Sequence, residues 1–293
     1  MKTSLTDKQA IAVFTLPALI IFTVMVFYPI TQTFYRSFFQ WDGLSQAKFI
    51  FFDNFKTLLK DDLFFISLKN GLIFSAMVTV FQISMGTILT FALLEDRVFG
   101  KRILRSSFFI PVVLSVTVAC QIWSSIYNAE FGLINKVLEA LHLSYQQDWL
   151  SNRTWSIFAV TFVNAWHYMG VQFALIYAGA KSIPPHYYEA AKIDGANIRQ
   201  THLRITIPLM AETYKMCLIF AIIGGLNAFA TMNILTKGGP GTATYTLTYL
   251  MYRSAFTINE FGYGCAVAVS LVLECILAKM IINKLVAREQ ITY

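Results

Sequence analysis

The sequence predicts an all-α membrane protein with six transmembrane helices, and three observations support this fold class. Hydrophobic residues make up 56% of the chain and charged residues only 13%, whereas soluble domains usually carry about 25% charged residues. The charges are clustered, so that long uncharged runs separate them. The alternating ten-residue pattern of barrel strands is absent. Because only helices and closed barrels satisfy the backbone in lipid, the uncharged runs are predicted to be helices.

Each predicted helix rests on a run of about 20 apolar residues, the length that spans a bilayer. Five runs are uncharged, and a sixth is interrupted by Glu274 and Lys279. The first run, Gln9–Tyr35, is too long for a signal peptide and has no small-residue cleavage site, so it is predicted to remain as a helix. The predicted helices cover about 10–35, 70–94, 106–128, 154–180, 209–236 and 261–284, in a single transmembrane domain over 1–293.

Basic residues near the helix ends predict the orientation. The loops Glu95–Arg105 and Lys181–Ile207 each carry four of them: Arg97, Lys101, Arg102 and Arg105 in the first, and Lys181, Lys192, Arg199 and Arg204 in the second. With six spans, both loops lie on the same side as the termini, which the positive-inside rule makes cytoplasmic. Five basic residues in the first outer loop weigh against this orientation, although four aspartates accompany them. The prediction is a multi-pass protein of the cell membrane with both termini in the cytoplasm.

Net charge and cysteine content argue against a nucleic-acid-binding protein, a disulfide-rich protein and a metal-binding protein. The formal net charge of +7 could indicate nucleic-acid binding in a soluble protein, but here it follows from the basic loops, so no nucleic-acid partner is expected. The four cysteines all lie in apolar runs and form no CxxC pair. They are predicted to be small buried residues, without a disulfide framework or a metal site.

The loop over residues 181–207 is the most informative part of the chain. Ser182 is predicted to cap a short helix that Pro184 or Pro185 begins, because proline suits the first turn of a helix. Glu189 then lies early in this helix, where the helix dipole favours a carboxylate.

Small residues follow Glu189 and would let the surface of a partner approach the backbone closely. They are Ala190, Ala191, Gly195 and Ala196. Gly195 is predicted to end the helix with a positive φ, and a second short helix, at about Asn197–Arg204, leads to Pro208. These features suit a docking element and, equally, an ordinary interfacial helix that re-enters the membrane.

Four motifs carry a resemblance to a known family. They are Glu189-Ala-Ala191 with Gly195 and Ile205-Thr-Ile-Pro208; Leu235-Thr-Lys-Gly-Gly-Pro240; Gly100-Lys-Arg102 with Arg105 and Phe108-Phe-Ile-Pro111; and Leu16-Pro17 with Tyr28-Pro29 and Ser37-Phe38. In this combination the chain resembles, over essentially its whole length, the permease subunits of binding-protein-dependent ABC importers of the carbohydrate-uptake, maltose-type family. Ile207 replaces the usual leucine of the first motif, and Ala211 stands where the family often has a second proline.

The resemblance implies the maltose-type permease fold, with a cytoplasmic coupling helix that docks on a separate ATPase. The residues it assigns to this coupling are Glu189, Ala190, Ala191, Asp194, Gly195, Ile205 and Pro208. The implied partners are a second homologous permease, two ABC ATPase subunits, an extracytoplasmic solute-binding protein, a sugar and the lipid bilayer. No cofactor is expected on this chain, and ATP and Mg would be bound by the ATPase subunits.

Polar residues within the apolar runs suggest where a substrate could bind. Amides and aromatic faces suit sugars, and Asn164, Trp166 and Asn227 supply both. The resemblance implies a sugar site for Asn164-Ala-Trp166 and, less directly, for Asn227. Hydrogen bonding between helices is the alternative use of such residues. For Glu274, pairing with another helix and a role in transport both remain open.

Catalytic motifs are missing from the sequence. It has no G-x-x-x-x-G-K-[ST], HExxH or G-x-S-x-G, so ATP hydrolysis is expected on separate subunits and the chain is not expected to be an enzyme. The predicted function is the permease subunit of an ATP-driven ABC importer for an oligosaccharide or sugar derivative. An ion-coupled secondary transporter acting without an ATPase is the alternative, and Glu274 would be its candidate ion-coupling carboxylate.

Overall fold

A computed structural model describes residues 7–94, 98–143 and 147–286, with side chains from residue 11 onward. Both termini and Arg97, on which the predicted orientation partly rests, lie outside the described residues. The described chain is mainly helical and forms two compact units. Unit 1 holds the chain up to Asp61 together with Leu250–Ser270, and unit 2 holds Asp62–Tyr249 and the chain from Leu271 onward.

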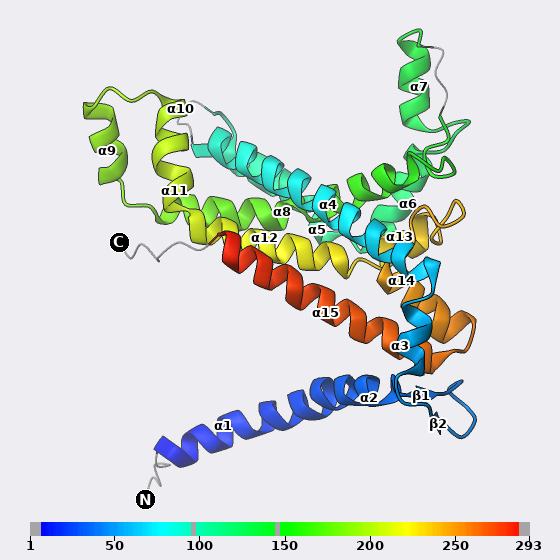
Figure 1. The fold of residues 1–293 in the computed structure, drawn as a ribbon. Helices are drawn as coiled ribbons and strands as arrows, with labels where there is room; N and C mark the ends of the chain where they lie inside the picture. The colour runs from blue at the N-terminus through cyan, green and yellow to red at the C-terminus, as the bar shows by residue number, and fades with distance from the viewer. Residues whose placement is uncertain (1–6, 95–97, 144–146, 287–293) are drawn as a thin grey trace, which may run out of the picture. The chain divides into compact units, whose positions relative to one another are not determined.

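Unit 1 begins with one long helical rod (Figure 1). The rod consists of α1 Asp7–Phe22, the π-helical turn η1 Thr23–Phe27 and α2 Tyr28–Arg36. A two-stranded antiparallel sheet of β1 Phe39–Gln40 and β2 Lys48–Phe49, the short helix α3 Asp53–Leu58, η3 Arg253–Thr257 and the first part of α15 Phe261–Leu285 complete the unit.

The buried amide of Asn54 organises the small sheet of unit 1. Its Nδ2 donates to the carbonyl oxygens of Ser37 and Phe39 at 2.8 and 2.9 Å. This joins α3 to the chain that leads into β1. Nearby, the Tyr263 hydroxyl donates to the Asp61 carboxylate at 2.6 Å, so α15 is tied to the segment after α3.

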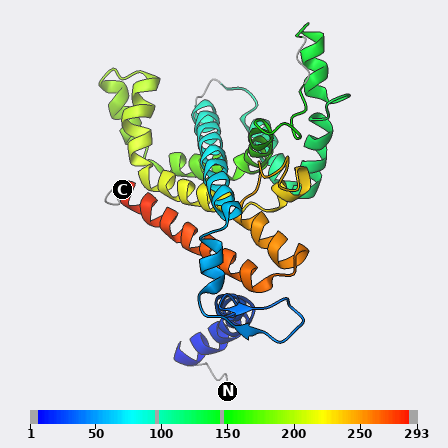
Figure 2. The ribbon, with the colours of Figure 1, turned by 45° about the vertical axis from the view of Figure 1, so that its right-hand side comes forward.

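Unit 2 is built around α8. Its helices are α4 Asp62–Leu94, α5 Lys101–Val113, α6 Val116–Ile126, α7 Leu133–Ala140, α8 Ser156–Ser182, α9 His186–Ile193, α10 Ile198–Thr201, α11 Ile207–Leu209, α12 Ala211–Leu226 and α13 Ala230–Leu235, with the turn η2 His202–Thr206 before α11. α14 Leu247–Tyr252 joins the two units along the chain. α8 packs against α4, α5, α6, α12 and α13, and Figures 1 and 2 show it among them.

Small residues allow the helices of unit 2 to approach one another closely. A Cβ atom at Gly170 of α8 would lie 2.6 Å from the Phe108 carbonyl oxygen of α5. A Cβ atom at Gly225 of α12 would lie 2.7 Å from the Ser75 Cα of α4. Close backbone contact of this kind is typical of helix packing in membranes.

Two of the predicted helices are interrupted. The prediction of one helix over 106–128 is replaced by α5 and α6, which meet at an angle of 98°. Leu114 and Ser115 are extended at this break, and the Ser115 side chain caps α6 by accepting a hydrogen bond from the Val118 N–H.

The second interruption falls within 209–236. α12 ends where Asn227 closes its last turn, and α13 begins only at Ala230. Before α12, the chain bends by 72° between Leu209 and Ala211, so Pro208 belongs to the helical segment that precedes the bend.

Within the described part of the chain, three helices could cross a membrane by length and hydropathy: Ile11–Arg36, Asp62–Leu94 and Phe261–Leu285. The number rises to five if each bent pair counts as one span. α8 is 27 residues long but is not among these candidates, because it carries Asn164, His167 and Gln172. The predicted total of six spans therefore remains a prediction.

Candidate functional site

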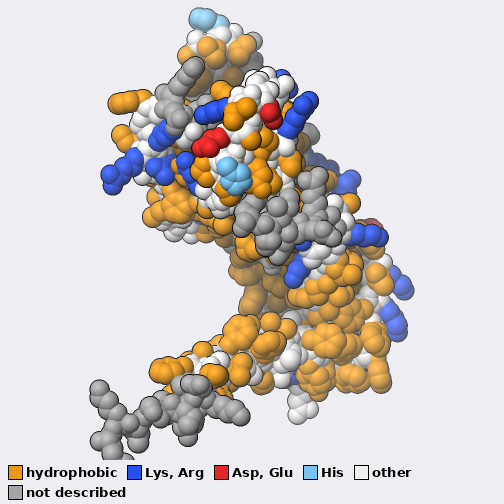
Figure 3. All heavy atoms as spheres, turned by 90° about the vertical axis from the view of Figure 1, so that its left-hand side faces the viewer, with side chains coloured by type: hydrophobic (Ala, Val, Ile, Leu, Met, Phe, Trp, Pro, Cys, Tyr) orange, Lys and Arg blue, Asp and Glu red, His pale blue; other side chains and the backbone are white. Residues whose placement is uncertain are grey.

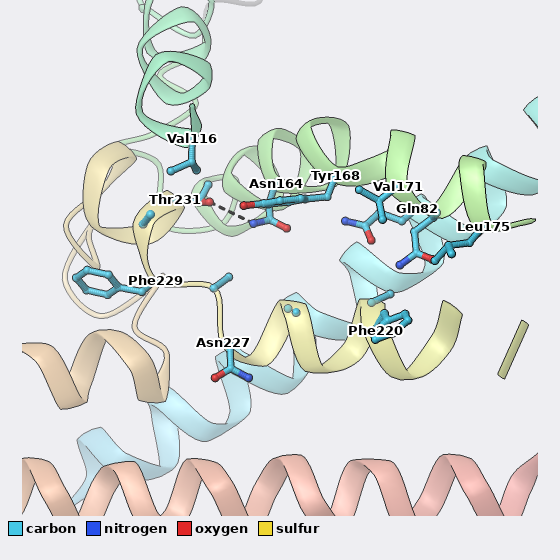
Figure 4. A pocket seen from close by; sticks show the side chains of 16 residues that line it. Gln82, Val116, Asn164, Tyr168, Val171, Leu175, Phe220, Asn227, Phe229 and Thr231 are labelled. Atoms are coloured by element: carbon cyan, nitrogen blue, oxygen red, sulfur yellow. Dashed lines mark hydrogen bonds between the residues drawn. The ribbon is translucent and has the colours of Figure 1, made fainter. Parts of the chain in front are cut away.

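A cavity of about 780 Å³ lies within unit 2, beside α8. Its walls come from α4, α8 and α12, the linker after α12 and the start of α13 (Figure 4). The lining residues are Gln82, Val116, Asn164, Tyr168, Val171, Gln172, Leu175, Phe220, Ala221, Gly224, Gly225, Asn227, Ala228, Phe229, Ala230 and Thr231. The break between α12 and α13 thus places backbone and side chains of the linker at the cavity.

Buried amides give the cavity its polar character. Gln82, Asn164 and Gln172 are each at most 5% exposed. The Asn164 Nδ2 donates to the Thr231 hydroxyl at 3.2 Å, whereas its Oδ1 accepts no hydrogen bond from any described residue. The Gln172 Oε1 likewise lacks a partner within the described chain. An acceptor left unpaired is costly, so the Asn164 Oδ1 suits a ligand that donates a hydrogen bond.

The three residues predicted for the substrate site are placed differently. Asn164 and Asn227 both line the cavity, but Trp166 does not. Its ring packs edge-on against Trp123 instead, with the centroids 5.5 Å apart. Residues two positions apart lie on nearly opposite faces of a helix, so Asn164 and Trp166 cannot face one cavity. The aromatic side chain that α8 presents there is Tyr168, one turn after Asn164.

The amide of Asn227 is turned away from Asn164 (Figure 4). Its Nδ2 donates to the Ile223 carbonyl oxygen at 2.9 Å and approaches the Cys275 Sγ of α15 at 3.5 Å. Glu274 is half-buried and does not line the cavity, and its Oε1 accepts no hydrogen bond from the described residues. The sequence reasoning did not single out Gln82. Its signal was an amide in the middle of the apolar run 70–94.

The predicted coupling residues lie on an arm that projects beyond the ends of α8 and α12 in Figures 1 and 2. α9 forms its outer part and α10, η2 and α11 its return. Helix α9 begins after Pro185, but the cap predicted at Ser182 is wrong. Ser182 instead ends α8, and its hydroxyl donates back to the Gly179 carbonyl oxygen at 2.8 Å.

The tip of the arm has a well-defined backbone. Gly195 has φ +71°, as predicted, and the Ala196 N–H donates to the Ala191 carbonyl oxygen at 2.9 Å, which closes α9 as glycine-terminated helices commonly close. Asn197 and Gln200 then form a reciprocal capping box that begins α10.

Exposed side chains cover the outer surface of this tip. Glu189, Ala190 and Asp194 are exposed, whereas Ala191 is buried. Ile193 is 86% exposed, which is unusual for an isoleucine. Figure 3 views unit 2 from this end, where Lys and Arg side chains gather near Asp and Glu. The other predicted coupling residues, Ile205 and Pro208, lie half-buried on the return of the arm.

The base of the arm contacts the long helices. The His202 ring stacks on Phe91 of α4 with the centroids 4.2 Å apart and the planes 4° from parallel. The Thr206 hydroxyl lies 3.4 Å from the Tyr188 hydroxyl and 3.3 Å from the His202 Nδ1. The His202 ring therefore joins the base of the arm to α4.

None of the described residues forms a group of three or more His, Cys, Asp or Glu side chains that could hold a metal ion. The polar and aromatic side chains that line the cavity belong to Gln, Asn, Thr, Tyr and Phe residues.

Comparison with known proteins identifies the family. Residues 9–290 match the family described as "Binding-protein-dependent transport system inner membrane component". The chain belongs to this family. It is thus a membrane-embedded permease subunit of a binding-protein-dependent ABC transporter, and not an enzyme. This result favours the predicted importer over the ion-coupled secondary transporter.

Relatives extend over most of the chain. The probable ABC transporter permease protein YurN of Bacillus subtilis is 36% identical over 259 residues, which cover 87% of this chain and 88% of YurN. The arabinooligosaccharides transport system permease protein AraP of the same organism is 31% identical, over 95% of this chain and 88% of AraP.

A solved structure has the same fold. It is the crystal structure of a bacterial ABC transporter involved in the import of the acidic polysaccharide alginate, and the matching chain aligns with a TM-score of 0.83 over 94% of both chains. At 21% identity, this likeness establishes the permease fold alone.

Proposed function

We propose that this permease subunit translocates a sugar, an oligosaccharide or sugar derivative, through the cavity beside α8. The observation that carries the proposal is the set of three buried amides, Gln82, Asn164 and Gln172, around one cavity with Tyr168. Sugar hydroxyls can donate to an unpaired amide oxygen such as the Asn164 Oδ1, and an aromatic face can cover the apolar side of a sugar ring. The arabinooligosaccharide transport named for AraP, a relative over 95% of this chain, supports the same substrate class.

The arm is proposed to be the coupling element of the transporter. Glu189, Ala190, Asp194 and Gly195 present an exposed polar surface with little bulk, onto which an ABC ATPase subunit could dock. The aromatic stack between His202 and Phe91 would carry the movement of the arm into α4. ATP and Mg would be bound by two such ATPase subunits, so this chain would need no cofactor of its own.

The proposed topology is a single permease domain over 1–293 with six spans, in which α8, the bent pair of α5 and α6, and the segment 209–236 that contains α12 each cross the membrane. Both termini and the arm would face the cytoplasm. Lys181, Lys192, Arg199 and Arg204 are exposed around the arm, which supports this orientation. A second, homologous permease would complete the pore, and an extracytoplasmic binding protein would deliver the sugar.

Reconstitution tests the proposed function. The chain is co-expressed with the products of its neighbouring permease, ATPase and binding-protein genes, and uptake of labelled arabinooligosaccharides and other oligosaccharides into vesicles is measured. Uptake should require ATP, the binding protein and this chain. Uptake that persists without ATP, or that is confined to solutes without hydroxyl groups, would contradict the proposal.

A further inference from the structure

A second concave surface of unit 2 lies outside the candidate cavity, between α5 and α8. It is an open groove of about 660 Å³. The two helices run in opposite directions. Arg105 lies beside Tyr177, whereas the carbonyl oxygen of Leu114, directly after α5, lies 3.1 Å from the His167 Nε2. The basic start of α5 therefore lies beside the end of α8.

At this end of the groove, two positively charged side chains, Arg105 and Lys181, lie near the ring of Tyr177. The Arg105 guanidinium lies 5.4 Å from the centroid of the Tyr177 ring, and the Lys181 Nζ lies 5.9 Å from the same centroid. Arg102 and Arg105 line the groove one turn apart, whereas Lys181 lies beside its end, next to Tyr177, and is not a lining residue. None of the three forms an ion pair with a described residue. Like charges held close together repel one another, so an anion between them would relieve the repulsion.

The rest of the groove is apolar and open. Phe109, Ile110 and Val113 follow the arginines on the same face of α5 and are 41%, 58% and 75% exposed. Ala174 on α8 leaves room opposite them. At 1.5 Å per residue, the α5 face from Arg102 to Val113 is roughly 16 Å long, about half of the ~30 Å hydrocarbon thickness of a bilayer. The groove thus has the length of one leaflet, with positive charge at one end.

We infer that this groove binds an anionic phospholipid, with the phosphate between Arg102, Arg105 and Lys181 and an acyl chain along Ile110 and Val113. Basic pockets between membrane helices bind anionic headgroups in this way. A soluble anion would explain the cations but not the apolar length that continues from them. A neighbouring apolar helix would explain the apolar face but would itself supply no counter-charge to the three cations.

Photo-crosslinking tests the site in the assembled transporter. The complex is placed in nanodiscs that contain a trace of phosphatidylglycerol with a diazirine in its acyl chain, or the matched phosphatidylcholine probe. Labelled peptides are then mapped by mass spectrometry. We expect the peptides of α5 and α8 that line the groove to be labelled at least about fivefold more by phosphatidylglycerol, because several basic residues attract its anionic headgroup.

The variants Arg105→Gln and Lys181→Gln, singly and together, should remove this preference and leave the phosphatidylcholine labelling unchanged. Lys284→Gln, which removes an exposed lysine from the last turn of α15, is the matched control and should retain the preference. Equal labelling by the two lipids would show that the groove contacts lipid without preference for an anionic headgroup, and would overturn the inference. So would absence of labelling, which would indicate a covering protein helix, or loss of the preference on adding glycerol 3-phosphate, which would indicate a soluble-anion site.

Discussion

The Asn164 amide nitrogen donates to the Thr231 hydroxyl over 3.2 Å, and this bond joins α8 to α13 at the wall of the cavity. The same side chain therefore serves two purposes. Its nitrogen holds two helices together, while its oxygen is left available to the cavity. Hydrogen bonding between helices and sugar binding, which the sequence left as alternatives, are compatible at this residue.

Substitutions at Thr231 and Asn164 should distinguish the contribution of their hydrogen bond to stability from the contribution of the Asn164 oxygen to uptake. Thr231→Val keeps the shape of the side chain but leaves the Asn164 donor unpaired, so it should destabilise the protein by about 1–3 kcal/mol and lower the melting temperature, with uptake largely kept. Asn164→Ala also removes the oxygen, and uptake should fall about tenfold or more. Vesicle uptake and thermal unfolding in detergent measure both effects. Equal uptake by the two variants would assign Asn164 a packing role alone.

Tyr168 and Trp166 offer a second comparison on the same helix. Tyr168 lines the cavity, whereas Trp166 packs on Trp123. Tyr168→Ala should lower uptake more than it lowers the melting temperature. Trp166→Ala removes a half-buried aromatic pair, so its main effect should be on stability, by roughly 0.5–1.5 kcal/mol beyond the lost area. The reverse order of effects would support the original assignment of Trp166 to the sugar site.

Gly195 should be essential for coupling. Its φ of +71° disfavours any side chain, and a Cβ atom there would project into open space, where a docking partner would meet it. Gly195→Asp should abolish uptake while the chain still inserts into the membrane, as judged by its level in isolated membranes. Gly100 has φ +73° and equally open surroundings, so Gly100→Asp controls for backbone strain and should transport. Normal uptake by Gly195→Asp would falsify docking at this tip.

Gly170 should be required for packing of α5 on α8. Its Cβ position lies 2.6 Å from the Phe108 carbonyl oxygen, so Gly170→Ala forces the helices apart and should cost roughly 1–3 kcal/mol. Gly71 lies within α4 and has no atom near its Cβ position. There, Gly71→Ala should be neutral or stabilising by up to about 1 kcal/mol. Thermal unfolding of both variants measures the difference, and an undisturbed melting temperature for Gly170→Ala would contradict the contact.

The helix breaks explain what the sequence could not predict. Ser115 lies inside an apolar run, and hydropathy alone gives no reason to end a helix there. Its capping role depends on the extended backbone at Leu114 and Ser115, which tertiary packing selects. Asn227 likewise looked like a polar residue within a long helix, whereas the chain leaves the helix at this position. Hydropathy predicts that these segments are apolar but not where they bend.

Other features were accessible from local chemistry. The positive φ of Gly195 followed from its place after a helix, and the structure confirms it. The prediction that Trp166 shares a site with Asn164 could have been avoided from the sequence. Each residue turns a helix by about 100°, so two residues two positions apart lie on nearly opposite faces. The sequence could not predict that Gln82 and Asn164 line the same cavity, because only the packing of α4 on α8 brings them there.

The polarity of α8 has a consequence for biosynthesis. A helix that hydropathy does not recognise as a span is a poor candidate to leave the translocon for lipid by itself, because Asn164, His167 and Gln172 would enter hydrocarbon unsheltered. α4 and α5 are already made when α8 emerges, but Thr231 is synthesised 67 residues after Asn164. Nascent α8 should therefore stay beside the insertion machinery, or against α4, until α12 and α13 arrive, and chains truncated after α8 should be substrates for membrane quality control.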